Sequence, residues 1–210
     1  MPIPFEPWLD YPSLTLQNLT FIAGIMRDAR DGAVQLHDVE AGDSNWSLGC
    51  RVYSRIMAQM RSASFSIPWL TVLPESQALR FTFAVGTVPL KFYRGDVDDV
   101  PQKYLEPSFT ELRQMDLAFK TDGIDSTNLL RIAVEPDASG KTSTVTLVEV
   151  EESGIPLRVF QIPLDSANVI EMKPKPINLE PPTLEVIDES AEEGKRVRGE
   201  DQFGSAGTTS

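Results

Sequence analysis

Apolar residues recur at intervals of three and four positions in three stretches of the chain, residues 15–30, 44–61 and 109–119. This spacing fits the 3.6-residue turn of an α-helix that buries one face. Ser108 precedes the third stretch and Glu111 follows three positions later, which is the capping box of a helix start. We expect Gly32 to end the first helix. The residues predicted to form the buried side of the third helix are Phe109, Leu112, Met115 and Phe119.

A different pattern, the alternation of apolar and polar residues, marks the strands. Residues 79–85 and 88–93 alternate on either side of Gly86-Thr87, a two-residue turn of the kind that closes a β-hairpin. The register that this turn implies pairs Val85 with Val88, Phe83 with Leu90 and Phe81 with Phe92. Three further strands, separated by turn residues, predict a meander over 130–134, 142–150 and 157–164.

These elements together predict an α+β fold. In the expected two-layer domain, about three helices cover one face of a mainly antiparallel sheet, made of the hairpin and the three-stranded meander, and the other face meets water. We place this single globular domain at residues 1–172. Residues 1–13, rich in proline and aromatic side chains, are expected not to form a helix and to lie against the domain; the alternative is an extended arm for a partner. Residues 173–210 are Pro-rich and then acidic, and we predict that they form a disordered tail.

The charge balance excludes several classes of partner. The 210 residues include 31 Asp and Glu against 19 Lys and Arg, for a net charge of -12. General nucleic-acid binding depends on neutralising phosphates, and anionic membrane surfaces attract basic segments, so neither is expected of this chain. An acidic protein of this kind is suited to a protein partner with a basic surface.

The single cysteine, Cys50, and the single histidine, His37, limit the chemistry further. The chain cannot form a disulfide within itself, and a metal site with two or more histidines is excluded. The first residues lack the basic and apolar segments of a secretory signal, and the longest apolar runs are far shorter than a membrane span. We therefore expect a cytoplasmic protein, and we predict no cofactor.

Three groups of residues are candidates for a site. Asp96, Asp98 and Asp99 stand close enough in sequence for their carboxylates to hold a hard cation, although acidic residues after a strand also form ordinary solvated loops. The other two groups concern partners, and their members are Arg51, Arg55 and Arg61 on the second helix, and Leu184, Val186 and Ile187 in the tail.

The arginines and the tail segment each have two interpretations. The arginines either form a basic patch for an anion or nucleic acid, or pair with the abundant acids of the same chain. The tail segment, short, apolar and flanked by acids, is either a strand that a partner's sheet takes up at its edge or tail without a role.

No catalytic constellation stands out, so the sequence favours a non-enzymatic interaction or regulatory protein. An inhibitor, an antitoxin-like or immunity-like partner of a basic protein, or an accessory protein of a defence system fits the charge. The alternatives are an enzyme whose site is assembled from dispersed carboxylates and arginines, or a nucleic-acid-associated protein that uses the arginine patch. A deep pocket with convergent polar groups would favour the enzyme, and an exposed apolar surface would favour the binding protein.

Overall fold

In a computed structural model of the chain, the described residues are 2–74, 81–122, 128–151 and 153–164. By its internal contacts the chain divides into two units, Met1–Ile170 and Glu171–Ser210, and all described residues belong to the first. The predicted domain boundary at 172 and the disordered tail lie outside the described residues. Among those that are described, none of the helices combines the length and the apolar character needed to cross a membrane.

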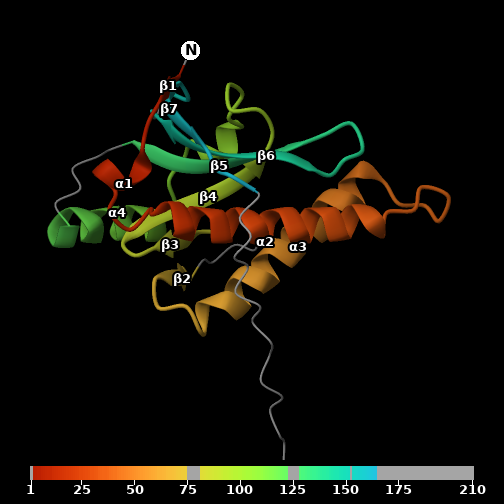
Figure 1. The fold of residues 1–210 in the computed structure, drawn as a ribbon, viewed down its shortest axis with the longest axis horizontal. Helices are drawn as coiled ribbons and strands as arrows, with labels where there is room; N and C mark the ends of the chain where they lie inside the picture. Colours follow the sequence, from red (N-terminus) through yellow and green to blue (C-terminus); the bar gives the residue numbers. More distant parts are fainter. Residues whose placement is uncertain (1, 75–80, 123–127, 152, 165–210) are drawn as a thin grey trace, which may run out of the picture. The chain divides into compact units, whose positions relative to one another are not determined.

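The first unit is an α+β domain built on one seven-stranded sheet (Figure 1). The strand order is β1-β7-β6-β5-β4-β3-β2, with parallel pairs at β1–β7 and β4–β5 and antiparallel pairs elsewhere. The strands are β1 (Ile3–Pro4), β2 (Leu70–Val72), β3 (Phe83–Val85), β4 (Val88–Arg94), β5 (Leu129–Pro136), β6 (Thr142–Val150) and β7 (Pro156–Gln161). The α+β class is thus confirmed. The observed sheet is, however, larger than the predicted hairpin plus meander, and it is mixed where a mainly antiparallel sheet was predicted.

The predicted hairpin and meander form the central part of this sheet. In β3 and β4, Val85 pairs with Val88 and Phe83 with Leu90, in the register that the sequence predicted. Gly86 in the turn has φ 59°, and a Cβ there would lie 2.7 Å from the Ser13 side chain, so both conformation and space require glycine. The meander is confirmed as the antiparallel strands β5, β6 and β7.

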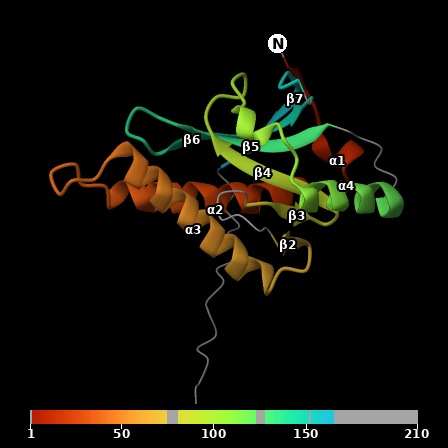
Figure 2. The same ribbon diagram turned by 180° about the vertical axis from the view of Figure 1, so that it is seen from behind.

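Two long helices, α2 (Leu16–Gln35) and α3 (Asn45–Ser64), pack against each other and cover one face of the sheet (Figures 1 and 2). Each begins at a cap: Thr15 accepts from the backbone of Asn18, and Ser44 forms a capping box with Ser47. The expected stop at Gly32 is wrong, since α2 runs three residues past it. A Cβ at Gly32 would lie 3.0 Å from Nη1 of Arg55, so glycine serves the close approach of α3 there.

The N-terminal segment lies against the domain, as expected, but it adds an edge strand to the sheet and contains a helical turn, neither of which was predicted. The helix α1 (Pro7–Asp10) starts with proline, whose missing N–H costs nothing at the first position of a helix. Phe5 donates its backbone N–H to Val159, and the ring of Trp8 meets Phe160 edge-on at 5.4 Å.

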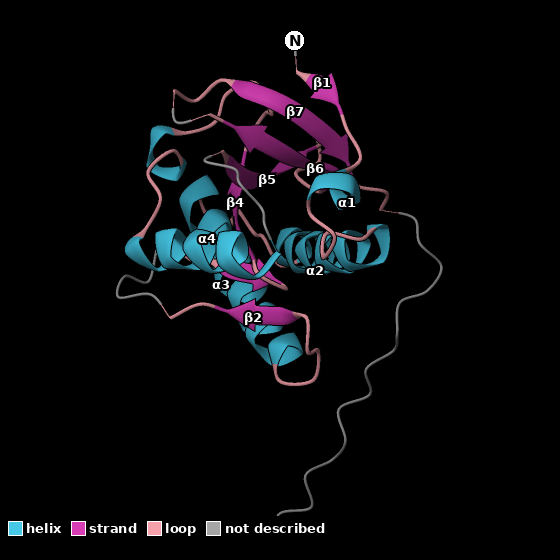
Figure 3. Cartoon of the chain, turned by 90° about the vertical axis from the view of Figure 1, so that its left-hand side faces the viewer, coloured by secondary structure: helices cyan, strands magenta, loops and turns pink. Residues whose placement is uncertain are grey.

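The centre of the second face of the sheet is covered by protein. The prediction of a two-layer domain whose second face meets water is therefore wrong at this point. All but the last residue of β4, and the first six residues of β5, are buried, so both faces of these strands are covered. A second apolar cluster on this face includes Tyr93, Val148 and Leu105. The crossover from β4 to β5 lies over it and contains the 3-10 turn η1 (Gln102–Tyr104) and the helix α4 (Phe109–Asp122). In Figure 3, α4 is seen apart from α2, beside β4.

Candidate functional site

The covered second face contains two fully buried cations. Lys91 on β4 and Arg131 on β5 are paired in the parallel register and are 3% and 0% exposed. Their neighbours Leu90 and Leu130 point into the core under α2 and α3, so alternation directs both cations to the opposite face. Charged side chains in such a place require an anion close by.

Glu111, near the start of α4, supplies that anion. Its Oε2 lies 2.5 Å from Nζ of Lys91, and its Oε1 accepts from Nη1 of Arg131 at 2.5 Å. The same carboxylate caps α4, because it accepts from the backbone of Ser108 at 3.4 Å while Ser108 Oγ accepts from Glu111 N at 3.3 Å. The predicted capping box is therefore present, and one residue both starts the helix and attaches it to the sheet.

Backbone carbonyls share the excess positive charge of this triad. Arg131 Nε donates to the carbonyl of Tyr104 at 2.7 Å, and Lys91 Nζ donates to that of Glu106 at 3.4 Å. Burial lowers the pKa of Arg131, and the adjacent Glu111 partly opposes that shift. The guanidinium of Arg131 nonetheless stays protonated at neutral pH.

Attachment through Glu111 decides which side of α4 faces the solvent. The buried residues of this helix are Glu111 and Ala118, seven apart and therefore on one line along the helix. The predicted buried side is wrong for three of its four members: Phe109, Leu112 and Phe119 are 75%, 49% and 53% exposed. Only Met115 is half-buried. The buried line of α4 is shifted from the predicted one by one residue, about 100° around the helix. The reason is that the sheet beneath α4 carries Lys91 and Arg131, which need the carboxylate of Glu111.

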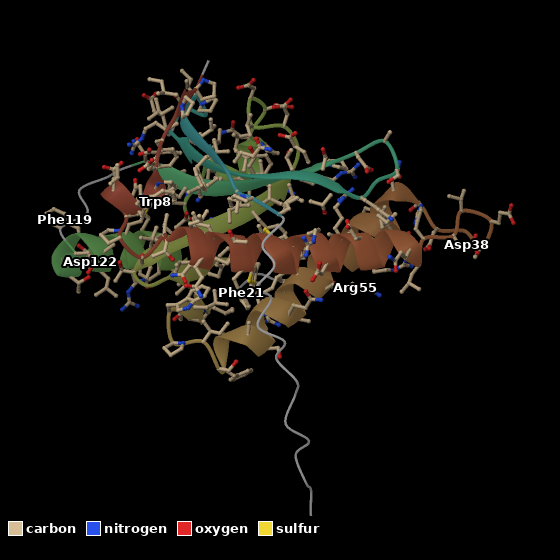
Figure 4. All side chains as sticks on the ribbon, viewed as in Figure 1. Trp8, Phe21, Asp38, Arg55, Phe119 and Asp122 are labelled. Carbon is tan, nitrogen blue, oxygen red and sulfur yellow. The ribbon has the colours of Figure 1, made fainter. Side chains whose placement is uncertain are left out.

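Phe109, Leu112 and Phe119, with Met115 at their margin, form what we name the α4 apolar face. In Figure 4, Phe119 and Asp122 lie at the end of the domain that is farthest from Asp38 in the α2–α3 loop. The helix α4 is also fixed to the hairpin turn, since Gln114 donates to the carbonyl of Thr87 and Asp122 accepts from the Thr87 hydroxyl. The exposed residues thus belong to a firmly held helix.

Two cavities bordered by described residues differ in the chemistry that their linings could support. One, lined by polar Tyr11, Glu111 and Asn128 among apolar residues, has about 20 Å³, little more than one water molecule needs, so it is too small for a substrate. An open groove of about 500 Å³ borders Arg27 and the start of β6. Hydroxyls, amides and apolar groups make up the rest of its described lining, without a histidine, cysteine or carboxylate, so it lacks a general acid or base.

The three candidate arginines do not meet as one patch. Arg51 donates to both carboxylate oxygens of Asp43, at 3.0 and 3.1 Å, and to the carbonyl of Leu36. Arg55 faces α2 at Gly32. Arg61 is exposed and stands six residues farther along α3, which turns it about 120° away from Arg55.

The acidic loop after β4 is organised by its own hydrogen bonds. Asp96 Oδ1 accepts from the backbone of Asp98 at 3.0 Å, and the carbonyl of Asp96 accepts from Asp99 N and from the Tyr93 hydroxyl. In the part of the chain that the structure describes, no three His, Cys, Asp or Glu side chains come together where they could hold a metal ion. Leu184, Val186 and Ile187 lie outside the described residues.

Sequence reasoning missed the triad and the exposure that follows from it. One signal was available: Lys91 and Arg131 interrupt two strongly apolar strands at positions that the hydrophobic pattern assigned to the solvent-exposed face.

Comparison of the chain with protein-family models, with curated proteins and with solved structures finds no match.

Proposed function

We propose that this protein is a non-enzymatic interaction protein that binds another protein through the α4 apolar face. The observation that carries the proposal is that Phe109, Leu112 and Phe119 are exposed on a helix fixed to the sheet by Glu111. Large apolar side chains gathered on one face of a surface helix are typical of an interaction site. Burying one such side chain fully contributes about 1.5–3 kcal/mol, so a partner that covers all three gains several.

The partner surface that fits the α4 apolar face best is an apolar groove in a different protein. A face of 14 residues is about 21 Å long. Packed flat against a second copy of itself, it falls short of the roughly 1,200 Å² that stable complexes bury. A groove that encloses the helix on two sides buries more of each side chain, as in helix-in-groove recognition. The net charge of -12 supports a basic partner, for which this chain would be an inhibitor, an immunity-like protein or another regulator.

Site-directed photocrosslinking tests the proposal. Phe119 is replaced by the photoreactive p-benzoylphenylalanine in cells of the source organism, and the crosslinked protein is identified by mass spectrometry and purified. We expect Phe119→Ser to weaken binding to that protein by about tenfold or more. The control Leu117→Ser changes a residue that is 45% exposed on another side of α4, and binding should then be unchanged.

Two outcomes would contradict the proposal. The first is a Phe119 derivative that crosslinks to no protein. The second is a purified pair whose affinity is the same for Phe119→Ser and for the parent chain.

A further inference from the structure

A second set of exposed apolar side chains lies at the tip of the α2–α3 hairpin, remote from α4 (Figures 1 and 4). Leu36, Val39 and Trp46 are 60%, 71% and 78% exposed, and all belong to the eleven residues that follow α2, form the loop and start α3. We name residues 36–46 the hairpin tip. Trp46 is the largest of these side chains, and a tryptophan is among the residues most often found at the energetic centre of a protein interface.

The hairpin tip is held in shape by a carboxylate at its centre. Asp43 accepts from the backbone of Asp38 at 3.0 Å, from the Ser47 hydroxyl at 3.1 Å and from Arg51. These hydrogen bonds hold the pKa of Asp43 below its ordinary value, and the bond from the backbone of Asp38 contributes most. Asp38 in turn accepts from the backbones of Glu40 and Ala41, so the loop is ordered by its own hydrogen bonds. A preorganised loop loses little conformational entropy when it docks.

The hairpin tip carries three acids and one histidine, His37, whose Nδ1 lies 3.6 Å from Oδ2 of Asp43. Residues 36–46 contain Asp38, Glu40 and Asp43 and no lysine or arginine. The nearest arginine in sequence, Arg51, is already paired with Asp43. Asp38 and Glu40 are exposed, so they carry their charge to whatever covers the tip. An anionic membrane would repel them, whereas a protein surface with lysines and arginines would attract them.

We propose that the hairpin tip inserts Trp46 into an apolar pocket of a protein partner whose rim is lined by lysine and arginine. Trp46 and Val39 fill the pocket, and Asp38 and Glu40 meet the basic rim. This surface is separate from the α4 apolar face, so either one can be disabled without the other. A chain with both surfaces would hold two different proteins at opposite ends of its domain.

Cys50 makes the inference directly testable. It is the single cysteine of the chain, it is exposed, and it follows Trp46 by one helical turn. Benzophenone-4-maleimide attached to Cys50 and irradiated in extract of the source cells should crosslink a protein, which is then identified, produced and purified. With that purified protein and the unlabelled chain, Trp46→Ala should weaken binding about 30-fold. The matched control is Phe65→Ala, an aromatic residue 92% exposed just past the other end of α3, and it should bind like the parent.

The same purified protein, mixed with variants of this chain, tests whether the partner's surface is basic. The double variant Asp38→Asn, Glu40→Gln should associate several-fold more slowly at low salt and lose most of the salt dependence of the parent. Phe119→Ser should leave binding at the tip unchanged, which separates this surface from the α4 apolar face.

Any of four results would overturn the inference. These are no crosslink from Cys50, equal losses for Trp46→Ala and Phe65→Ala, an affinity that does not depend on salt, and a blue shift of an environment-sensitive dye on Cys50 with neutral phosphatidylcholine vesicles. The last would mean that the tip enters lipid instead of a protein pocket.

Discussion

Replacing Glu111 by glutamine is the most direct test of how α4 is held. The substitution keeps the size of the side chain and one carbonyl oxygen but removes the negative charge. Lys91 and Arg131 would then remain buried, 3% and 0% exposed, without the carboxylate that contacts both. Removing one partner of a buried ion pair costs about 3–5 kcal/mol, because the remaining charge has neither water nor a counter-ion. Here two cations lose the same anion, so we expect the upper part of that range.

Urea denaturation, followed by circular dichroism, measures the effect. A loss of about 4 kcal/mol is a large share of the 5–15 kcal/mol that stabilise a typical domain. With a denaturant slope of roughly 2 kcal/mol per molar urea, the midpoint should fall by about 2 M. The matched control is Asp116→Asn, which removes an acid from an exposed pair with Lys120 on the same helix. Exposed pairs contribute little, so its midpoint should shift by less than about 0.3 M.

Two further variants separate charge from packing. Lys91→Met leaves Glu111 with Arg131, a balanced pair, and should therefore cost less than Glu111→Gln. The triple replacement Lys91→Met, Glu111→Leu, Arg131→Met removes all three charges and should recover most of the lost stability. A Glu111→Gln midpoint within about 0.5 M of the parent, or a Lys91→Met cost as large as that of Glu111→Gln, would refute the reasoning.

Two other predictions concern the core and the pH dependence of stability. Phe81→Ala should cost about 3–5 kcal/mol in the same urea assay, because this buried ring contacts Phe83 and Phe92 at 6.0 and 6.2 Å between centroids, and an unchanged midpoint would contradict it. Burial raises the pKa of Tyr93 above its ordinary value near 10, so its hydroxyl should stay neutral in the folded protein at pH 11, and the stability it contributes should be present below pH 10 and be lost as the pH rises further. Absorbance at 295 nm, compared between the parent and Tyr93→Phe, measures this, and ionisation of Tyr93 at pH 11 with native circular dichroism would contradict it.

The parts of the fold that follow from local sequence could be predicted, and those that depend on distant partners could not. The hairpin register at Val85 and Val88 was predictable, because a two-residue turn leaves few alternatives. The strands β1 and β2 escaped notice, since two or three residues show no periodicity. The parallel pairing of β4 with β5 was also beyond reach, because alternation identifies a strand but not its neighbour.

The candidate site shows the same limit more sharply. The apolar spacing of Phe109, Leu112 and Phe119 identified a helix correctly and its buried side wrongly. The orientation of α4 is decided by Lys91 and Arg131, which are 20 residues away on either side in the sequence. Periodicity shows that a helix has an apolar side, but it cannot show whether the rest of the chain covers that side. The capping role of Glu111 was visible in the sequence, and its contacts with the two cations were not.

The two ends of the sheet have a consequence for how the protein behaves in crowded solution. Among the described residues, its edge strands are β1, two residues long with Pro4 as the second, and β2, three residues long. An edge strand exposes unpaired N–H and C=O groups that can recruit the strands of other molecules, and very short or proline-containing edges offer few of them. The short edge strands therefore protect the long central strands from edge-to-edge pairing with the sheets of other molecules, which is how fibres form. At high concentration, molecules should meet through side chains and not through shared backbone ladders.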